Sequence, residues 1–438
     1  MATATTILDR SLKADLLAAP RPQGWAALRE AAESRLQGLE LPTTRLEDWK
    51  YLDLAALAQQ SFIPAPPVAP EAIDIRDRIL PEARGTRLVF VNGHHDSHHS
   101  CVSALPAGVR LLHLAAASEG AAQLGSLLDP AGADLFANLN TARFTDGAYI
   151  FVPKGVKVEA PLHLLFLSRQ EGGQATYTLP RILVVLERGA ELELIEEHTG
   201  EGRYLSNGAV EILVAEGAIL RHERVQRESA EAFHLSSLRA KVGRDARYLS
   251  RTISLGARLS RQAPRVELAA NAEISLDGLA LLNGDQVADT HSFIHHAQPH
   301  GTSRQLHKCI ADDASRAVFN GQILVAEGAQ VTDAQQQSRN LLLSEKATID
   351  TKPQLEIYAD DVKCAHGAAV GALDPEELFY LQSRGLNLQA ARNLLTYGFA
   401  ADLLSHIEVA SLRRALRQTV MARTNAADLV GSGLVETA

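Results

Sequence analysis

Cys364 and His366 stand two positions apart in the stretch from Leu355 to Gly367, directly after an alternating, strand-like segment. In a strand, residues i and i+2 project from the same face, so the thiol and the imidazole are expected side by side. Together they suit zinc, copper or iron, including iron–sulfur clusters. Two ligands do not complete a tetrahedral site, so other ligands must come from another chain or from the cargo. Spacing alone favours the alternative, a small buried cysteine beside a hydrogen-bonded histidine.

The composition bounds the class of protein. At 438 residues we expect two or three folding units, and 46% hydrophobic with 22% charged residues is an ordinary globular balance. The net charge of −9 argues against nucleic-acid binding. No apolar run reaches the length of a membrane span, and residues 1–10 lack the basic and apolar regions of a signal peptide. We therefore expect a cytoplasmic protein without a membrane partner.

Cysteine usage supports the same compartment. The three cysteines, Cys101, Cys309 and Cys364, are far apart in the sequence. An odd number without short spacings does not describe a disulfide framework and fits a reducing environment.

The first 80 residues predict a helical N-terminal domain. Residues 6–19 and 23–39 carry apolar side chains at helical spacing, and prolines interrupt them. The charged block from Arg45 to Tyr51 is expected to pack Trp49 on the core. The segment from Ser61 to Pro70 holds four prolines and is expected to be an extended linker.

Residues 81–372 have a different pattern, with short β-rich runs separated by Gly, Asn and Asp and little convincing helix between them. The expected strands cover Leu88–Val91, Ala148–Val152, Ile182–Leu186, Glu191–Glu197, Ala209–Val214, Tyr248–Leu255, Leu276–Leu282 and Gln322–Val325.

A four-residue unit recurs through this region. It consists of a residue that tolerates positive φ, a small residue and then an inward apolar residue. The copies begin at Gly189, Gly217, Gly256 and Gly328, with degenerate copies at Asn271 and Lys346. Such corners predict a β-solenoid. Four Asn-Gly pairs, at Asn92, Asn207, Asn283 and Asn320, leave an antiparallel sandwich as the alternative.

Residues 373–438 return to a helical pattern. Asp374 is the expected N-cap, followed by proline at the first helical position, and Gly385 is expected to close that helix. Two further helices are expected at 388–404 and 408–419, and disorder after Ala422. The apolar stripe of the first of these two helices suits either core packing or partner docking.

Absent catalytic motifs and two groups of histidines limit the possible functions. The sequence contains no P-loop, no dinucleotide fingerprint and no nucleophile elbow, so no catalytic apparatus is recognisable. Histidines cluster at His94–His99 and between His291 and His307. We expect the first group in a polar surface turn and the second in polar packing between coils, with metal binding as the minority alternative for both.

Motifs from Asp289 onward carry a family resemblance. They are Asp289-Thr290-His291, Pro299–Ser303, Phe319-Asn320-Gly321, Ala329–Ala334, Arg339–Ser344, Lys352–Ile357, Ala359–Ala368 and Leu378–Gly385. Together they closely resemble the SufB/SufD family of iron–sulfur cluster assembly proteins, and Arg45–Tyr51, Leu139–Ala142 and Val152–Gly155 agree. Two departures from SufB favour the SufD branch: no cysteine stands in Lys346–Asp350, and Gly367 replaces a glutamate.

The resemblance implies a mainly β fold, with a right-handed parallel β-helix core between helical N-terminal and C-terminal domains. It implies a non-catalytic scaffold that pairs with SufB and binds the ATPase SufC through its C-terminal helices, or forms a homodimer in isolation. A nascent, transient iron–sulfur cluster would take His366 as a ligand, with Cys364 a weaker candidate and no permanent cofactor. The residues expected to dock SufC are Asp374, Phe379, Arg384, Leu386, Leu394, Leu395 and Phe399.

Two other classes of protein remain alternatives. A cytosolic β-helix carbohydrate-active enzyme could use Asp360 and Asp361 as paired carboxylates, although such enzymes are usually exported. A purely structural or metal-storing homodimeric β-helix protein would have no affinity for an ATPase.

Overall fold

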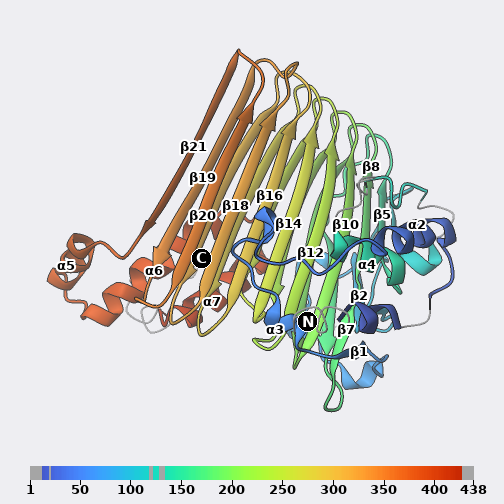
Figure 1. The fold of residues 1–438 in the computed structure, drawn as a ribbon, viewed down its shortest axis with the longest axis horizontal. Helices are drawn as coiled ribbons and strands as arrows, with labels where there is room; N and C mark the ends of the chain where they lie inside the picture. Colours follow the sequence, from blue (N-terminus) through green and yellow to red (C-terminus); the bar gives the residue numbers. More distant parts are fainter. Residues whose placement is uncertain (1–11, 19–20, 118–121, 128–133, 427–438) are drawn as a thin grey trace, which may run out of the picture.

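Two β-sheets face each other along most of the chain in the computed structural model, which describes residues 12–18, 21–117, 122–127 and 134–426 (Figure 1). Sheet A contains β1 (Phe62–Pro64), β4 (Arg110–His113), β5 (Gly147–Val152), β7 (Ala175–Thr178), β8 (Arg181–Leu186), β10 (Tyr204–Val214), β12 (Phe233–Val242), β14 (Leu259–Leu268), β16 (Val287–His296), β18 (Arg316–Val325) and β20 (Thr348–Ile357). Sheet B contains β2 (Arg87–Val91), β3 (His94–His95), β6 (Leu162–Arg169), β9 (Glu191–Glu201), β11 (Ile219–Arg227), β13 (Arg247–Ser254), β15 (Glu273–Leu282), β17 (Thr302–Ala311), β19 (Thr332–Leu342) and β21 (Val362–Gly371).

From β8 onward the chain alternates between the sheets, and each strand pairs in parallel with the strand one coil away. The predicted parallel β-solenoid is therefore confirmed. The Asn-Gly pairs mislead because only Asn92-Gly93 turns an antiparallel hairpin, between β2 and β3. Asn207-Gly208 and Asn320-Gly321 lie inside β10 and β18, and Asn283-Gly284 lies between β15 and β16.

The repeated corner units are confirmed in part. Gly189, Gly217 and Asn271 have φ of 67°, 66° and 57°, and the alanine at the second position of every unit is buried. In the units that begin at Gly256 and Gly328, positive φ instead falls on Ala257 (65°) and Val331 (60°). Val331 is also exposed rather than inward, so the unit that begins at Gly328 departs from the predicted corner.

The N-terminal helices cover the outer face of sheet A. Residues 12–18, α2 (Ala26–Leu36), α3 (Ala55–Ala58) and α4 (Leu135–Arg143) share one apolar cluster with strands of that sheet. The helix expected at 6–19 falls partly outside the described residues. The expected linker contains β1, which pairs in parallel with β7. As predicted, Trp49 packs on the core, with its ring 5.8 Å from that of Phe136.

Helix α4 corrects the expectation of little helix among the strands. Its N-cap, Asp134, accepts a hydrogen bond from the backbone N–H of Ala137 at 3.0 Å. Short 3-10 turns complete the connections: η1 (Glu47–Trp49), η2 (Pro70–Ala72), η3 (Arg76–Arg78), η4 (Pro81–Ala83) and η5 (Leu114–Ala116).

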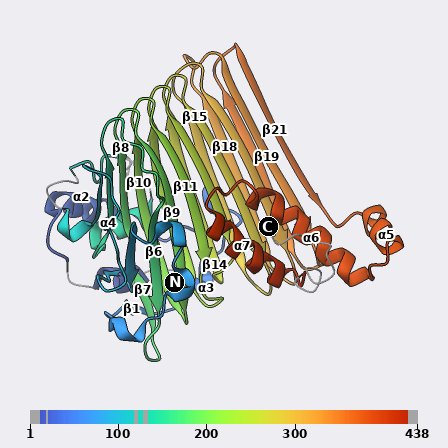
Figure 2. The same cartoon turned by 180° about the vertical axis from the view of Figure 1, so that it is seen from behind.

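The C-terminal helices lie against sheet B. Helices α6 (Leu388–Leu404) and α7 (Ala410–Arg423) pack on its outer face, as Figure 2 shows. Helix α5 (Pro375–Ser383) extends away from the solenoid and buries no residue. All three helices were predicted, and α7 continues four residues beyond its expected end. The rest of the expected disordered tail, residues 427–438, lies outside the described residues. No described helix is long and apolar enough to cross a membrane.

Candidate functional site

The solenoid ends in two edge strands, β20 in sheet A and β21 in sheet B. Each is bonded to one neighbour, β18 and β19 respectively. Cys364 and His366 both lie on β21 with the parity that faces the inside of the coil, as their spacing predicts. His366 is exposed, whereas Cys364 is half-buried and packs against the inner core. The imidazole is thus open to a contacting molecule.

The two candidate ligands differ in their readiness to bind metal. Burial, the largest cause, raises the pKa of the Cys364 thiol above its ordinary value. A metal-binding thiol must lose its proton, so this environment disfavours Cys364 relative to a neutral imidazole. Within the described ranges, no group of three or more His, Cys, Asp or Glu side chains could hold a metal ion. Any metal at His366 therefore needs ligands from outside this part of the chain.

Behind His366, the interior of the solenoid is polar, which the sequence predicts for His307 but not for the glutamines beside it. The register aligns buried Gln305, Gln336 and exposed His366 across β17, β19 and β21. Two positions further along the same strands, His307 of β17 is the register partner of Ser338 of β19. The only sequence signal is the alternation of Gln336, Ser338 and Asn340 at inward positions, which reads as an exposed face until the register is known.

Two hydrogen bonds connect His307 and Ser338, inside the solenoid, to sheet A. His307 Nε2 lies 3.0 Å from Thr290 Oγ1, and the Ser338 hydroxyl accepts a hydrogen bond from Thr351 Oγ1 at 2.9 Å. Burial lowers the pKa of His307 to about 4, so the ring is neutral at physiological pH.

Several other histidines of the two predicted groups make hydrogen bonds or polar contacts within the fold. His296 Nε2 lies 2.9 Å from Ser303 Oγ, and His291 Nε2 lies 3.5 Å from Asp48. In the His94–His99 turn, buried Asp96 accepts from the backbone N–H groups of His98 and His99. The turn is therefore more ordered and less exposed than expected.

The predicted SufC-docking residues divide into two groups. On α5, Asp374 caps the helix by accepting from the Glu376 N–H at 2.8 Å, and Phe379 is 72% exposed. Arg384 follows the helix, with its guanidinium 5.2 Å from the centroid of the Tyr380 ring. These side chains are available to a partner.

The second group packs on the protein itself. Leu386, Leu394 and Phe399 contact the apolar cluster between α6, α7 and sheet B, and Leu395 is half-buried. These contacts explain Leu386, Leu394 and Phe399 without a partner, and the docking role of all four residues stays a prediction.

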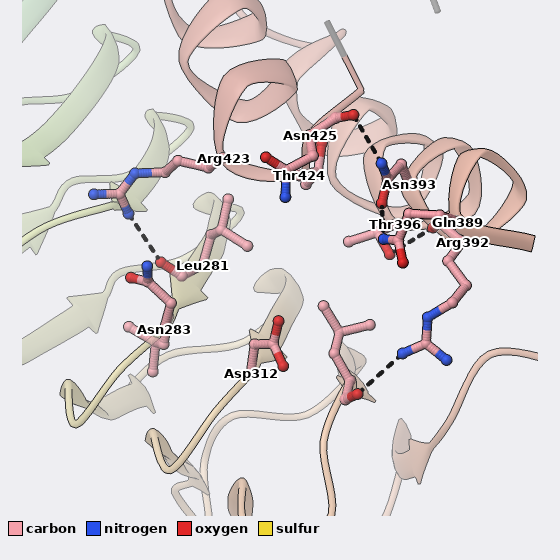
Figure 3. A pocket seen from close by; sticks show the side chains of 12 residues that line it. Leu281, Asn283, Asp312, Gln389, Arg392, Asn393, Thr396, Arg423, Thr424 and Asn425 are labelled. Carbon is pink, nitrogen blue, oxygen red and sulfur yellow. Dashed lines mark hydrogen bonds between the residues drawn. The ribbon is translucent and has the colours of Figure 1, made fainter. Parts of the chain in front are cut away.

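A cavity of about 90 Å³ separates α6 and α7 from the turns of the solenoid (Figure 3). Arg392 donates to the carbonyl of Leu343 at 3.1 Å, and Arg423 donates to that of Leu281 at 3.3 Å. Both arginines thereby tie the helices to the solenoid. The cavity has room for only a few water molecules, so we interpret the contacts around it as an anchor for the helices rather than as a ligand site.

Asp360 and Asp361 lie in the exposed turn between β20 and β21. The backbone carbonyl of Asp361 accepts from the N–H of Val331 at 2.6 Å, where the backbone is left-handed. The turn fixes the start of β21.

Two family models match the chain in succession. The SufBD N-terminal region matches residues 12–164, and the SufBD core domain of SUF-system FeS cluster assembly matches residues 166–399. The chain belongs to the SufB/SufD family. It is 40% identical to a SufBD family iron–sulfur cluster assembly protein of Synechocystis, with 90% of each chain covered.

Another relative is the iron–sulfur cluster assembly protein SufD of Escherichia coli, 34% identical over 92% of this chain and 95% of the relative. The chloroplastic protein ABCI7 of Arabidopsis thaliana is 36% identical over 66% of this chain and 62% of the relative. These matches confirm the predicted family and its SufD-like branch, and assign the chain to iron–sulfur cluster assembly.

Proposed function

We propose that this chain is a non-catalytic scaffold subunit of a Suf iron–sulfur cluster assembly complex, acting in the cytoplasm. It pairs with a SufB subunit through β20 and β21, binds the ATPase SufC through its C-terminal helices, and contributes His366 to the nascent cluster. The observation that carries this proposal is the position of His366, an exposed imidazole on the last strand of an open-ended solenoid.

The edge of the solenoid suits a second β-rich subunit. Unpaired N–H and C=O groups along β20 and β21 can extend either sheet with a strand from a partner. The inward positions of β21 include exposed Val370 as well as His366. A second solenoid placed here would cover apolar surface and bring its own ligands to the imidazole.

The cluster is cargo in this scheme, and His366 supplies one ligand. Neutral imidazole is a suitable ligand for iron, and the exposed ring needs no rearrangement of the coil to meet iron at the interface. The remaining ligands come from SufB and from the sulfide of the cluster. Cys364 is a secondary ligand, because its half-buried thiol has a raised pKa.

Helix α5 is the favoured SufC contact. Phe379 and Tyr380 are 72% and 56% exposed, and Leu388 at the start of α6 is 51% exposed. An exposed apolar group on a projecting helix marks an interaction site. The chain itself has no P-loop, so ATP binding belongs to SufC, and the solenoid transmits the resulting movement to the cluster interface.

The test is co-expression of the three subunits, with His366→Ala compared with the native chain and with Cys364→Ala. Stoichiometry is read from the purified complex, and cluster assembly from visible absorbance after supply of iron and sulfide. We expect His366→Ala to keep the stoichiometry and lose assembly, and Cys364→Ala to keep most of it. An intact His366→Ala complex that assembles clusters normally would remove His366 from the mechanism, and failure to copurify SufB or SufC would refute the partner assignment.

A further inference from the structure

Gln336 is the residue directly behind His366 in the solenoid. It lies on β19, is fully buried, and is the register partner of Gln305 on β17 and of His366 on β21. In parallel strands, register partners with the same parity stack along the axis of the solenoid at the spacing between strands. The Gln336 amide therefore lies between the interior and the edge that carries the imidazole.

The hydrogen bonds of the interior fix the direction of this amide. Gln305 Nε2 donates to Ser292 Oγ at 2.8 Å, and Gln336 Nε2 donates to Gln305 Oε1 at 2.8 Å. Gln336 Oε1 is buried and has no hydrogen-bond partner among the residues that the structure describes. Because the oxygen and nitrogen of a primary amide diverge, an amide that donates toward β17 leaves its oxygen free to accept from another group, and His366 of β21 is the register partner on the side opposite β17.

The surrounding packing keeps the amide in place. A Cβ atom on Gly321 of β18 would lie 2.4 Å from Gln336 Nε2 and 2.6 Å from Cζ of Phe319. The glycine thus leaves the space that the Gln336 side chain fills. A buried carbonyl oxygen without a donor is unfavourable, so this orientation favours a donor arriving from the last strand.

We propose that Gln336 is a positioning residue for His366. Its Oε1 accepts the N–H of the nearer imidazole nitrogen, which fixes the neutral tautomer and turns the lone pair of the other nitrogen outward. Groups that accept a hydrogen bond from the other ring nitrogen hold metal-binding histidines in this way, and their loss typically reduces metal affinity or activity about 10- to 100-fold. The consequence for cluster assembly rests on the proposed function, whereas the tautomer assignment does not.

The direct test is the tautomer of His366 in the full-length chain, read from ¹⁵N chemical shifts of histidine-labelled protein, with His366→Asn used to assign the signal. We expect one dominant tautomer in the native chain. Gln336→Met, which keeps the length of the side chain but removes the acceptor, should give a mixture of both tautomers. Gln337→Met is the matched control, because Gln337 has the opposite parity on the same strand and bonds Arg339.

Each result decides between two arrangements. A mixture of both tautomers in the native chain would mean that no acceptor holds the ring, which overturns the proposal. The same tautomer in the native chain and in folded Gln336→Met also overturns it. Far-ultraviolet circular dichroism and the melting temperature identify variants that do not fold, and Gln336→Leu is then the second variant.

Cluster assembly provides an independent readout. Gln336→Met should lower the assembly rate about tenfold in the native background and have no further effect when His366 is already alanine, because residues acting through one group are not additive. If His366→Ala abolishes assembly but Gln336→Met changes neither tautomer nor rate, the positioning role fails and the scaffold function stands. If His366→Ala has no effect on assembly, the scaffold role of His366 fails, and the tautomer result still decides the role of Gln336.

Discussion

Lys308 Nζ and Asp402 Oδ2 form an ion pair of 2.6 Å that joins strand β17 to helix α6. The same ammonium donates to the carbonyl of Phe399 at 3.0 Å and lies 4.8 Å from the centroid of its ring. The Lys308 side chain is only 4% exposed, whereas that of Asp402 is 57% exposed. One lysine from the solenoid therefore holds one turn of α6 by three contacts.

Removing one partner of this ion pair should weaken the packing of α6 on sheet B and lower the free energy of unfolding. We expect Asp402→Asn to cost on the order of 1–3 kcal/mol, because a nearly buried ammonium loses its anionic partner. Urea unfolding and hydrogen exchange of the α6 amides measure the effect. Lys241→Met, which breaks an ion pair exposed at both ends, is the control and should cost about 0–1 kcal/mol. Equal losses in the two variants would contradict a special role for Lys308.

The exposed and packed aromatic residues of the C-terminal helices should behave differently. Phe379→Ser removes a ring that is 72% exposed, so stability should change by less than about 0.5 kcal/mol while copurification of SufC is lost. Phe399→Ala should instead destabilise the chain by about 3 kcal/mol, because its ring packs against the cluster on sheet B. The measurements are melting temperature and SufC pull-down for both variants. Retention of SufC by Phe379→Ser would exclude this part of α5 as the contact.

Gly321 should tolerate no side chain. Alanine there would place Cβ 2.6 Å from the Phe319 ring and 2.4 Å from the Gln336 amide, which overpacks the interior and should cost about 1–3 kcal/mol. Gly367→Ala is the matched control, because a Cβ there meets no atom within 4 Å. Chemical denaturation of the two variants checks the difference, and comparable stabilities would show that the interior at Gly321 is loosely packed.

The stability contribution of two buried histidines, His296 and His307, should fall between pH 6.5 and about 4, whereas that of Glu223, whose pKa burial raises to about 7, changes in the opposite sense. Burial lowers the pKa of both His296 and His307 to about 4, so in this range the unfolded chain binds protons that the folded chain does not. Their effect is absent above pH 6.5 and complete near pH 4, with each ring costing about 3 kcal/mol by linkage.

Urea unfolding at pH 7 and pH 5 measures this dependence. His307→Asn should flatten the change between the two pH values, whereas His98→Asn, at an exposed turn position, should leave it unchanged. An unaltered pH dependence in His307→Asn would show that this ring does not titrate differently on folding.

Much of the fold followed from local patterns because a solenoid repeats its own local rules. Small residues at corners such as Gly189 and Gly217 recur with strands between them. Each coil packs only on its neighbours in the sequence, so the fold can be predicted without knowing contacts between distant parts of the chain. Helix α4 was missed because its apolar side chains are buried all round and give no amphipathic stripe. The shift of positive φ to Ala257 was also hidden, because the packing of coils decides which corner residue adopts it.

Only part of the candidate site could be predicted from the sequence. The spacing of Cys364 and His366 is a property of one strand, so their shared face could be predicted. Their exposure and the alignment of Gln336 depend on which strands are neighbours and in what register. A buried glutamine, moreover, looks like a surface residue by type.

The two edge strands also bear on how the subunit is made. Sheets A and B both end at strands that can pair with a strand of another chain. A copy of the chain without its partner is therefore expected to self-associate and precipitate. Synthesis matched to that of its partner, or prompt capture by it, would keep the chain monodisperse. Overproduction of this subunit alone should then yield concentration-dependent oligomers that a co-produced partner dissolves.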